Sequence, residues 1–474
     1  MIRHVLFAVA VAASVGFAGA ASGDPVAPPA KAPAAPKPPK YENLRFREDW
    51  TAFCGTCPGD RCDLSDRVKA LGLGCGGDVW VNVGGQVRAR YEAWDHQAFG
   101  APAGDDGWGL LRARLHVDLH LGHHVRLFAE GIYADADGRD GAPRPVDENH
   151  GDLQNLFVEG HGAVGAADVG GWVGRRELLF GKQRLVGPLD WANVRRTFEG
   201  GGGWVKGCNG RIDAFWVQPV VVEADEGDEA DDRVDFAGVH YVNTSRKDRT
   251  WEAYAYGLDK DVATWLGRTA DETRLTVGGL CTGPICGTCL DYDAEAAYQT
   301  GTFGDADISA WMATAELGWK PGGCGSLRFA LGADYASGDD GPGGDLGTFH
   351  QLFPTGHLWF GWADLVGRQN VFAARLTATA KPTEKLFLRL DAHQFWRAST
   401  DDAVYNAGGG VLRAAGTSDE REVATEFDLQ AKLTVDRHLE VEAGASYVLA
   451  GKFLEATGPD EDVTFFYVQV TITF

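Results

Sequence analysis

Residues 464–474 read Thr-Phe-Phe-Tyr-Val-Gln-Val-Thr-Ile-Thr-Phe, and their side chains alternate up to the last residue. One face of this segment is entirely apolar and holds Phe466, Val468, Val470, Ile472 and Phe474. A period of two residues indicates a β-strand. Roughly ten residues is the length that a tilted strand needs to cross a bilayer. The chain therefore ends in a candidate membrane-spanning strand whose last residue is aromatic.

The N-terminus indicates the compartment. Arg3 and His4 precede an apolar run, and Ala18-Gly19-Ala20 offers small residues for cleavage. This pattern is typical of a secretory signal peptide, with a membrane anchor as the alternative. No later stretch reaches the ~18 apolar residues of a transmembrane helix. Since only helices and closed barrels satisfy the backbone in lipid, the sequence predicts an all-β, transmembrane antiparallel barrel. Its last strand resembles the C-terminal signature of bacterial outer-membrane barrels.

Composition divides the chain into four predicted regions. Residues 1–20 are the signal peptide, and 21–40 form a Pro/Ala-rich linker that should be extended. Residues 41–78 form a short Cys-rich periplasmic extension, and 79–474 form the barrel. The net charge of -23 argues against nucleic acid as a partner. It is compatible with outer-membrane lipid, where lipopolysaccharide binds divalent cations.

Four arginines determine which face of the first strands points inward. Arg88, Arg90, Arg112 and Arg114 alternate with apolar residues. An arginine on the lipid face costs about 2–4 kcal/mol at mid-bilayer, so these four should face the lumen. The same alternation in a soluble sandwich is the alternative. Counting back from the C-terminus predicts about 18 strands, with 16 as the alternative because residues 200–280 are rich in glycine.

Loop length predicts which end of each strand faces the cell interior, since short turns lie in the periplasm and long loops outside. Short turns are predicted at 122–124, 162–171, 206–210, 245–249, 281–289, 320–326, 381–384 and 436–438. Long outer loops are predicted at 95–107, 134–151, 185–196, 219–234, 258–271, 336–368 and 398–421.

Nine cysteines follow the signal peptide, and an oxidising compartment makes disulfides the default. An odd number leaves at least one thiol free or paired elsewhere. All nine fall in the N-terminal extension or in predicted periplasmic turns, where disulfides would join the extension to the rim. A zinc site from Cys54-x2-Cys57 and Cys286-x2-Cys289 is the alternative. The disulfide candidates are Cys54, Cys57, Cys62, Cys75, Cys208, Cys281, Cys286, Cys289 and Cys324.

Several blocks of sequence resemble the alginate export family of outer-membrane barrels. The first reads Val-Gly-Arg-Arg-Glu-Leu-Leu-Phe-Gly-Lys-Gln-Arg-Leu-Val at 173–186, with Asp-Trp-Ala-Asn at 190–193. The second has Ser-Gly-Asp-Asp at 337–340 and Leu-Phe-Pro-Thr-Gly-His at 352–357, and shorter blocks occur at 402–408 and 444–451. The resemblance runs from about 79 to 474. It implies an 18-stranded barrel that conducts an anionic polysaccharide, with loops that help to control the pore.

The lumen side chains suit that task. A polyuronate carries a carboxylate on each sugar, so passage needs weak, repeated contacts with cations. Arginine meets carboxylates with a planar fork. Alternatively, these arginines only pair with acidic lumen neighbours such as Glu92, Glu130 and Asp391. The residues predicted to line the path are Arg88, Arg90, Arg112, Arg114, Arg126, Arg175, Glu177, Arg184, Arg195, Arg196, Arg328, Arg375 and Arg389.

The loop at 185–196 is a candidate constriction. Arg175 and Glu177 share a strand face and could anchor it as it folds inward. Arg184 lies at its base, and Arg195 and Arg196 end it. Trp191 either packs in this loop or stacks on a sugar.

Acidic segments complicate the simple picture of a basic pore. Glu426, Asp428, Glu440 and Glu442 are predicted to form a negative wall opposite the arginines. Residues 223–235 hold eight acids and one arginine. This loop is either a solvated surface or a calcium site.

The sequence contains no catalytic constellation, and no cofactor is predicted apart from the calcium alternative at 223–235, so it predicts a channel rather than an enzyme. His116, His120 and His393 share lumen faces without a surrounding motif. The predicted function is passage of an anionic, alginate-like polysaccharide or related polar solutes. The alternatives are a general diffusion porin and a structural or adhesive surface barrel without an open pore. Periplasmic secretion components are candidate partners.

Overall fold

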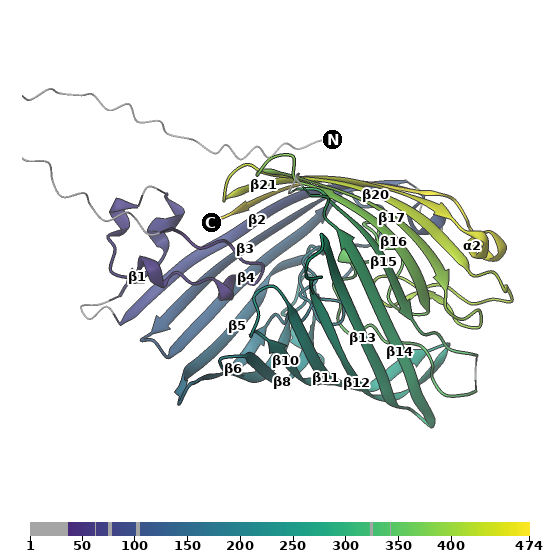
Figure 1. Cartoon of the computed structure of the whole chain (residues 1–474), viewed down its shortest axis with the longest axis horizontal. Helices are drawn as coiled ribbons and strands as arrows, with labels where there is room; N and C mark the ends of the chain where they lie inside the picture. The colour runs from purple at the N-terminus through teal and green to yellow at the C-terminus, as the bar shows by residue number, and fades with distance from the viewer. Residues whose placement is uncertain (1–36, 62, 74–77, 101–104, 323–325, 342) are drawn as a thin grey trace, which may run out of the picture. The chain divides into compact units, whose positions relative to one another are not determined.

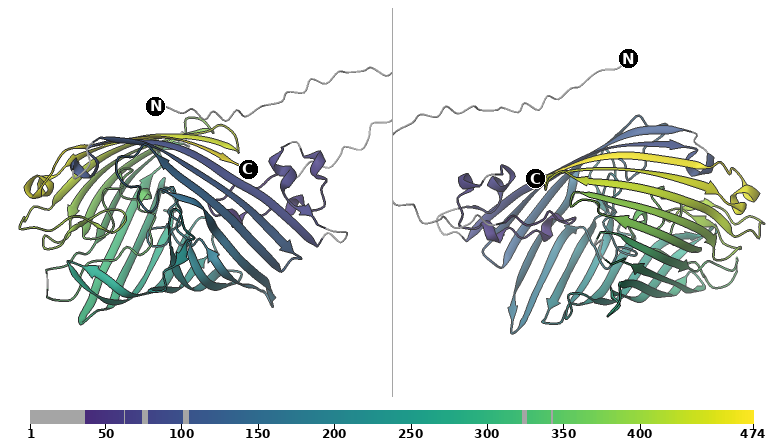
Figure 2. Two further views of the ribbon diagram at one scale, coloured as in Figure 1. Left: turned by 180° about the vertical axis from the view of Figure 1, so that it is seen from behind. Right: turned by 45° about the horizontal axis from the view of Figure 1, so that its top comes forward.

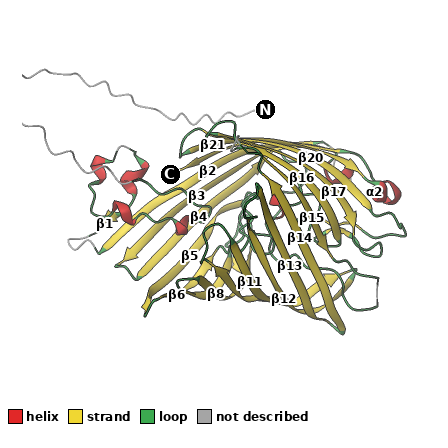
Figure 3. Ribbon diagram, viewed as in Figure 1, coloured by secondary structure: helices red, strands yellow, loops and turns green. Residues whose placement is uncertain are grey.

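Eighteen antiparallel strands form the wall of a closed barrel, as the sequence predicts (Figure 1). The computed structural model describes residues 37–61, 63–73, 78–100, 105–322, 326–341 and 343–474. The predicted signal peptide and most of the linker lie outside these ranges. Strands dominate the described residues (Figure 3). In that part of the chain, no helix has the length and apolarity to cross a membrane.

The barrel strands are β2 (Val79–Asp95), β3 (Asp106–Leu121), β4 (Val125–Asp137), β5 (Asn149–Val164), β6 (Ala167–Arg176), β7 (Phe198–Lys206), β8 (Gly210–Val221), β10 (Val234–Asn243), β11 (Thr250–Trp265), β12 (Arg268–Pro284), β13 (Leu290–Phe303), β14 (Ala306–Trp319), β15 (Arg328–Ala336), β16 (Val371–Ala380), β17 (Leu386–Arg397), β20 (Glu422–Thr434), β21 (Leu439–Ala450) and β22 (Val463–Thr473). The short elements are η1 (Arg45–Arg47), η2 (Thr51–Phe53), η3 (Pro58–Asp60), η4 (Ser65–Val68), β1 (Leu71–Gly72), α1 (Gln97–Gly100), β9 (Glu229–Ala230), η5 (Gly356–Leu358), β18 (Val404–Tyr405), β19 (Val411–Arg413) and α2 (Lys452–Thr457).

The last strand closes the barrel. β22 pairs with β21 on one side and with β2 on the other, so the C-terminus lies beside β2 (Figure 1). The register places Phe466 opposite Ala93 and Tyr467 opposite Glu92. Closure leaves no unpaired edge, which lipid would penalise.

The two faces of the wall differ in polarity. Outward side chains such as Leu115, Leu376 and Phe466 are apolar and exposed, as a lipid contact requires. Arg112 and Arg114 alternate with them and are buried inside. The predicted register is therefore confirmed for β2, β3 and β22.

Three predicted connections prove shorter than expected. The long outer loop predicted at 258–271 is wrong, because β11 and β12 continue to a two-residue turn at Leu266 and Gly267, both with positive φ. Positive φ at both positions is the geometry of a tight hairpin turn. The predicted turn at 162–171 shrinks to two residues, and the one at 281–289 begins after Pro284. The strands remain paired beyond the apolar band. There the side chains no longer alternate in polarity, so the sequence pattern does not show where the strands end.

The N-terminal extension packs at the barrel end that holds the C-terminus, opposite the end with α2 (Figures 1 and 2). Arg45 donates to the carbonyls of Gly85 (2.9 Å) and Phe474 (3.0 Å). Phe46 packs inside against Phe128 and Phe157. The extension thus contacts both the barrel seam and the inner wall.

Candidate functional site

The β6–β7 loop, residues 177–197, crosses the lumen. At its start Arg184 donates to Asp293 (2.7 Å) and Glu295 (3.0 Å) on β13. Further along, the backbone of residues 190–192 contacts β2 and β3. Because β13 lies far from β2 and β3 in the order of strands, this segment spans the barrel interior.

Three wall arginines hold this loop by its carbonyl groups. Arg88 donates to the carbonyls of Asp190 and Ala192, both at 2.7 Å. Arg90 donates to the carbonyl of Trp191 at 2.7 Å, and Arg112 to those of Asp190 and Ala192 at 3.1 Å. Charged donors make the stronger class of hydrogen bond. The arginines of β2 and β3 therefore position the loop.

Charge pairs fix the loop from its other side. Glu177 accepts from Arg195 at 2.5 Å and lies 3.5 Å from Arg114. Asp190 also pairs with Arg195, and with Arg112 at 3.0 Å. Burial alone would raise the pKa of Asp190, but Arg195 and Arg112 hold it well below its ordinary value. Asp190 thus stays ionised and keeps the segment attached to the wall.

A second loop, residues 337–370 between β15 and β16, meets the first inside the lumen. Val186 and Phe353 form a parallel bridge, and Gly187 donates its N–H to the Phe353 carbonyl at 2.9 Å. Thr355 donates likewise to the carbonyl of Gln183 (2.9 Å). The two loops therefore behave as one folded partition across the barrel.

Three rings pack together within this partition. Trp191 stacks on His357 with centroids 3.8 Å apart and planes 8° apart. Trp362 meets the edge of His357 at 4.4 Å and lies 6.2 Å from Trp191. We call Trp191, His357 and Trp362 the aromatic constriction.

A cavity lies on each side of the aromatic constriction, and all three rings line both. The outer chamber, about 520 Å³, is lined by four arginines and two carboxylates: Arg90, Arg139, Arg144, Arg196, Glu92 and Asp364. The inner chamber, about 410 Å³, is lined by four cations and three carboxylates: Arg88, Arg112, Arg389, Lys432, Asp190, Glu440 and Glu442. Asn43 of the N-terminal extension also reaches the inner chamber.

A third cavity of about 550 Å³ adjoins the outer chamber and shares Arg196 with it. Lys260 and the rings of Trp265 and Tyr405 line this side pocket, and no carboxylate does. Among the described residues, the Arg196 guanidinium donates only to the carbonyls of Gly187 and Pro354. Burial lowers its pKa to about 10, which leaves it protonated at neutral pH.

Ten of the twelve predicted path arginines have a carboxylate within 4.0 Å. Within the described residues, Arg88 and Arg196 alone among the twelve lack one. Arg328, Arg375 and Arg389 lie on β15–β17, away from the β2–β3 group, and pair with Asp291, Glu316 and Asp391. Arg126 and Arg175 pair with Glu159 and Glu199. The lumen is therefore a network of ion pairs with a few cations left for a solute.

The cysteine predictions are only partly reached by the structure. Cys54 and Cys57 lie in the extension, Cys208, Cys286 and Cys289 in turns at the same end, and no disulfide joins these or Cys281. Cys281 lies within β12 rather than in a turn. Cys62, Cys75 and Cys324 fall outside the described residues, so the disulfides stay a prediction.

Three groups of side chains have metal-binding geometry among the described residues. None includes a cysteine or a residue of the acidic 223–235 loop, so calcium at that loop also stays a prediction. Two of the groups lie where strand ends meet outer loops, and one is buried in the wall.

The alginate export family model matches residues 79–467, which is the whole barrel apart from the last residues. The chain belongs to the alginate export family. The match agrees with the resemblance drawn from the sequence blocks and with the 18-stranded fold. The protein is accordingly an outer-membrane channel. No curated protein sequence matches it.

Solved structures of similar fold include proteins of Acinetobacter baumannii and Pseudomonas aeruginosa. OccAB1 of Acinetobacter baumannii aligns with a TM-score of 0.58 at 12% identity, covering 83% of this chain and 97% of that one. OpdQ of Pseudomonas aeruginosa aligns at 0.56 and 12%, covering 83% and 98%. OccK11 (OpdR) of Pseudomonas aeruginosa aligns at 0.54 and 13%, covering 83% and 96%. At these identities the likeness shows the fold.

Sequence reasoning missed two rings of the aromatic constriction. His357 ends the second family-like block and Trp362 follows it closely. The sequence therefore indicates that this segment matters, but it does not predict the contact of these two rings with Trp191. Lys260 falls in the outer loop predicted at 258–271 and was therefore not among the predicted path residues. In the structure it belongs to β11 and lines the side pocket.

Proposed function

We propose that this family member passes an anionic, alginate-like polysaccharide through its lumen. One observation carries the proposal: the side pocket and both chambers are lined by more cations than carboxylates, in a protein of net charge -23. Three aromatic rings lie where the chambers meet, and they line both. Transport of this kind requires no chemical step by the protein.

General diffusion is the second candidate, and a specific observation favours it. Most lumen arginines are already paired with carboxylates, so the wall presents a mixed field rather than a basic track. A wall with both positive and negative side chains would admit small polar solutes of either charge.

Planar-bilayer current of the refolded protein separates the candidates. Polysaccharide passage predicts anion selectivity in a KCl gradient and stronger block by oligouronates than by neutral oligosaccharides. Arg196→Gln should weaken that block, whereas Lys40→Gln, at an exposed position at the end of the linker, should leave it unchanged. Weak selectivity with no uronate block would support the general porin. Absence of current would support a structural barrel closed by its loops.

A further inference from the structure

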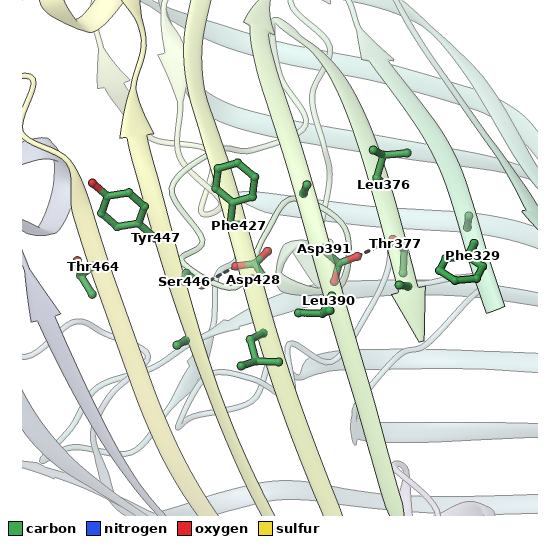
Figure 4. A pocket seen from close by; sticks show the side chains of 15 residues that line it. Phe329, Leu376, Thr377, Leu390, Asp391, Phe427, Asp428, Ser446, Tyr447 and Thr464 are labelled. Atoms are coloured by element: carbon green, nitrogen blue, oxygen red, sulfur yellow. Dashed lines mark hydrogen bonds between the residues drawn. The ribbon is translucent and has the colours of Figure 1, made fainter. Parts of the chain in front are cut away.

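Four inward side chains on two neighbouring strands form a buried square. β17 and β20 pair so that Asp391 lies opposite Asp428 and His393 lies opposite Glu426. All four are at most 5% exposed. Ligand atoms of Asp391, His393 and Asp428 lie within 4.8 Å of one another. Figure 4 shows the two aspartates on adjacent strands, each with a hydroxyl donor beside it.

The charges of this square are not balanced by the described side chains. Arg389 donates to both oxygens of Asp391, at 2.5 and 3.2 Å. Glu426 and Asp428 have no arginine or lysine within 4.0 Å among the described residues; His393 alone approaches Asp428. One arginine therefore faces three carboxylates. Like charges directly opposite in a sheet destabilise it, and a buried carboxylate without a counter-charge is costly.

Polar atoms in the square also lack hydrogen-bond partners. Among the described residues, Glu426 Oε2, Asp428 Oδ2 and His393 Nδ1 are buried and unpaired. The remaining carboxylate oxygens do have partners: Ser446 donates to Asp428 at 2.5 Å, and the Ala363 N–H to Glu426 at 3.0 Å. Asp428 Oδ2, the carboxylate oxygen that faces His393 Nε2, can therefore accept a further ligand.

The spacing suits a small cation. His393 Nε2 lies 3.5 Å from Asp428 Oδ2. Two ligands of a tetrahedral zinc ion, each about 2.0–2.2 Å from the metal, lie about 3.4 Å apart. One imidazole with carboxylates is a ligand set that suits Zn²⁺ and similar divalent transition metals.

We propose that Asp391, His393 and Asp428 bind a divalent transition-metal cation of the Zn²⁺ type, with Glu426 adding negative charge beside it. The cation would enter from the inner chamber. Arg389 and Gln430, the next inward residues on β17 and β20, line that chamber.

The proposed cation would act on the aromatic constriction. Glu426 accepts the Ala363 N–H, and Asp428 lies 3.5 Å from the Trp362 N–H. Both carboxylates therefore hold the loop segment that carries one of the three rings. Neutralising their repulsion should steady Trp362. This inference depends on the barrel and its loops, not on which solute passes.

Cobalt titration of the refolded full-length protein tests the site. The protein should carry no affinity tag and have its cysteines alkylated. His96→Gln and His150→Gln should also be introduced, because they belong to the two exposed clusters. After EDTA dialysis, one Co²⁺ per chain should produce visible absorption bands that Zn²⁺ abolishes. Asp428→Asn should lower the affinity at least tenfold, while Glu440→Gln, an inner-chamber acid outside the square, should not.

Two results would overturn the site: no zinc-sensitive bands in the parent protein, or equal affinity in Asp428→Asn. Should that variant fail to refold, His393→Gln provides the same comparison. Single-channel noise tests the link to Trp362, since Zn²⁺ should reduce current fluctuations in the parent and leave His393→Gln unaffected. Binding without any effect on noise would overturn the link while the site stands.

Discussion

The Trp191 ring is held between a cation and an imidazole. The Arg90 guanidinium lies 3.9 Å from the ring centroid and His357 lies 3.8 Å from it. Two groups at such distances cannot share one face, so they cover opposite faces. Cation–π and stacking contacts of this kind contribute about 0.5–2 kcal/mol each. The ring should therefore be fixed, and its size should set the passage between the chambers.

Replacing Trp191 by alanine should enlarge the passage. We expect the single-channel conductance of Trp191→Ala to rise roughly twofold, because the ring separates the two chambers. Trp311→Ala removes an exposed ring from the lipid face and serves as the control. Equal conductance in the parent and Trp191→Ala would mean that ions bypass the aromatic constriction.

Glu177 tests the cost of the buried charge network. It is buried and pairs with both Arg195 and Arg114, so Glu177→Gln leaves Arg195 with Asp190 alone and Arg114 with Glu130 alone. Removing one partner of a buried pair costs about 3 kcal/mol. Urea unfolding in detergent micelles should show that loss. Glu199→Gln, whose partner Arg175 lies at a more exposed site, should cost under about 1 kcal/mol.

At the scale of elements, alternation of apolar and polar side chains predicts the strands that cross the bilayer. β2, β3 and β22 could be predicted because lipid on one side and an aqueous lumen on the other sort their side chains. The β11–β12 hairpin was mistaken for a loop because its tip carries Asp259, Asp261 and Arg268 outside the apolar band. Pairing of backbones there is invisible to a polarity pattern.

The site was less predictable than the wall. The sequence predicts an inward fold for the 185–196 loop, but it does not predict that Arg88, Arg90 and Arg112 hold the loop by its carbonyl groups. Its contact with the 337–370 loop joins Val186 to Phe353, far apart in sequence, through backbone groups. A bridge between backbone groups does not depend on residue type, so the sequence could not predict it. His357 and Trp362 therefore could not be assigned to the aromatic constriction.

Docking of the N-terminal extension should depend on pH through Lys69. Burial lowers the pKa of Lys69 to about 8, although its Nζ donates to the Val83 carbonyl at 2.7 Å. The undocked chain then binds more protons between about pH 8 and 10.5, so docking becomes more stable as pH rises through that window.

Pulse proteolysis in urea can follow this docking. The urea midpoint for cleavage within residues 38–73 should increase from pH 7.5 to 10, and Lys69→Met should abolish that increase. Lys40→Met, at an exposed position, should retain it. An increase that persists in Lys69→Met would assign the effect to another group.

At the scale of the molecule, the barrel wall separates an apolar face toward lipid from a polar face toward the lumen. The same arginine substitution should therefore have different costs on the two faces. Leu115 faces lipid near the middle of β3, so Leu115→Arg should destabilise the barrel by about 2–4 kcal/mol. Thr471→Arg places the same charge in the inner chamber opposite Glu440 and should cost far less. Urea unfolding of both variants in lipid vesicles provides the comparison. Similar losses would contradict the assigned orientation of the strands.

The net charge of the whole protein is negative, whereas the two chambers and the side pocket have more cations than carboxylates in their lining. Selectivity should therefore depend on which of these charges a permeating ion senses. Close contacts in the chambers favour anions, whereas the acidic outer loops act over longer distances. The Debye length falls from about 10 Å at 0.1 M salt to about 3 Å at 1 M. As the salt concentration rises, screening should weaken the repulsion between anions and the distant acidic loops before it weakens the close contacts in the chambers.

We therefore expect anion selectivity, measured as reversal potential in KCl gradients, to increase between about 0.03 and 0.3 M mean salt before it declines at higher salt. Neutralising acids in the 223–235 loop, for example Asp225→Asn with Glu226→Gln, should raise selectivity at low salt and leave the high-salt value unchanged. The double variant Arg196→Gln, Lys260→Gln should lower selectivity across the range. Selectivity that only falls with salt, and that ignores the loop variants, would mean that permeating ions respond to the cavity lining alone.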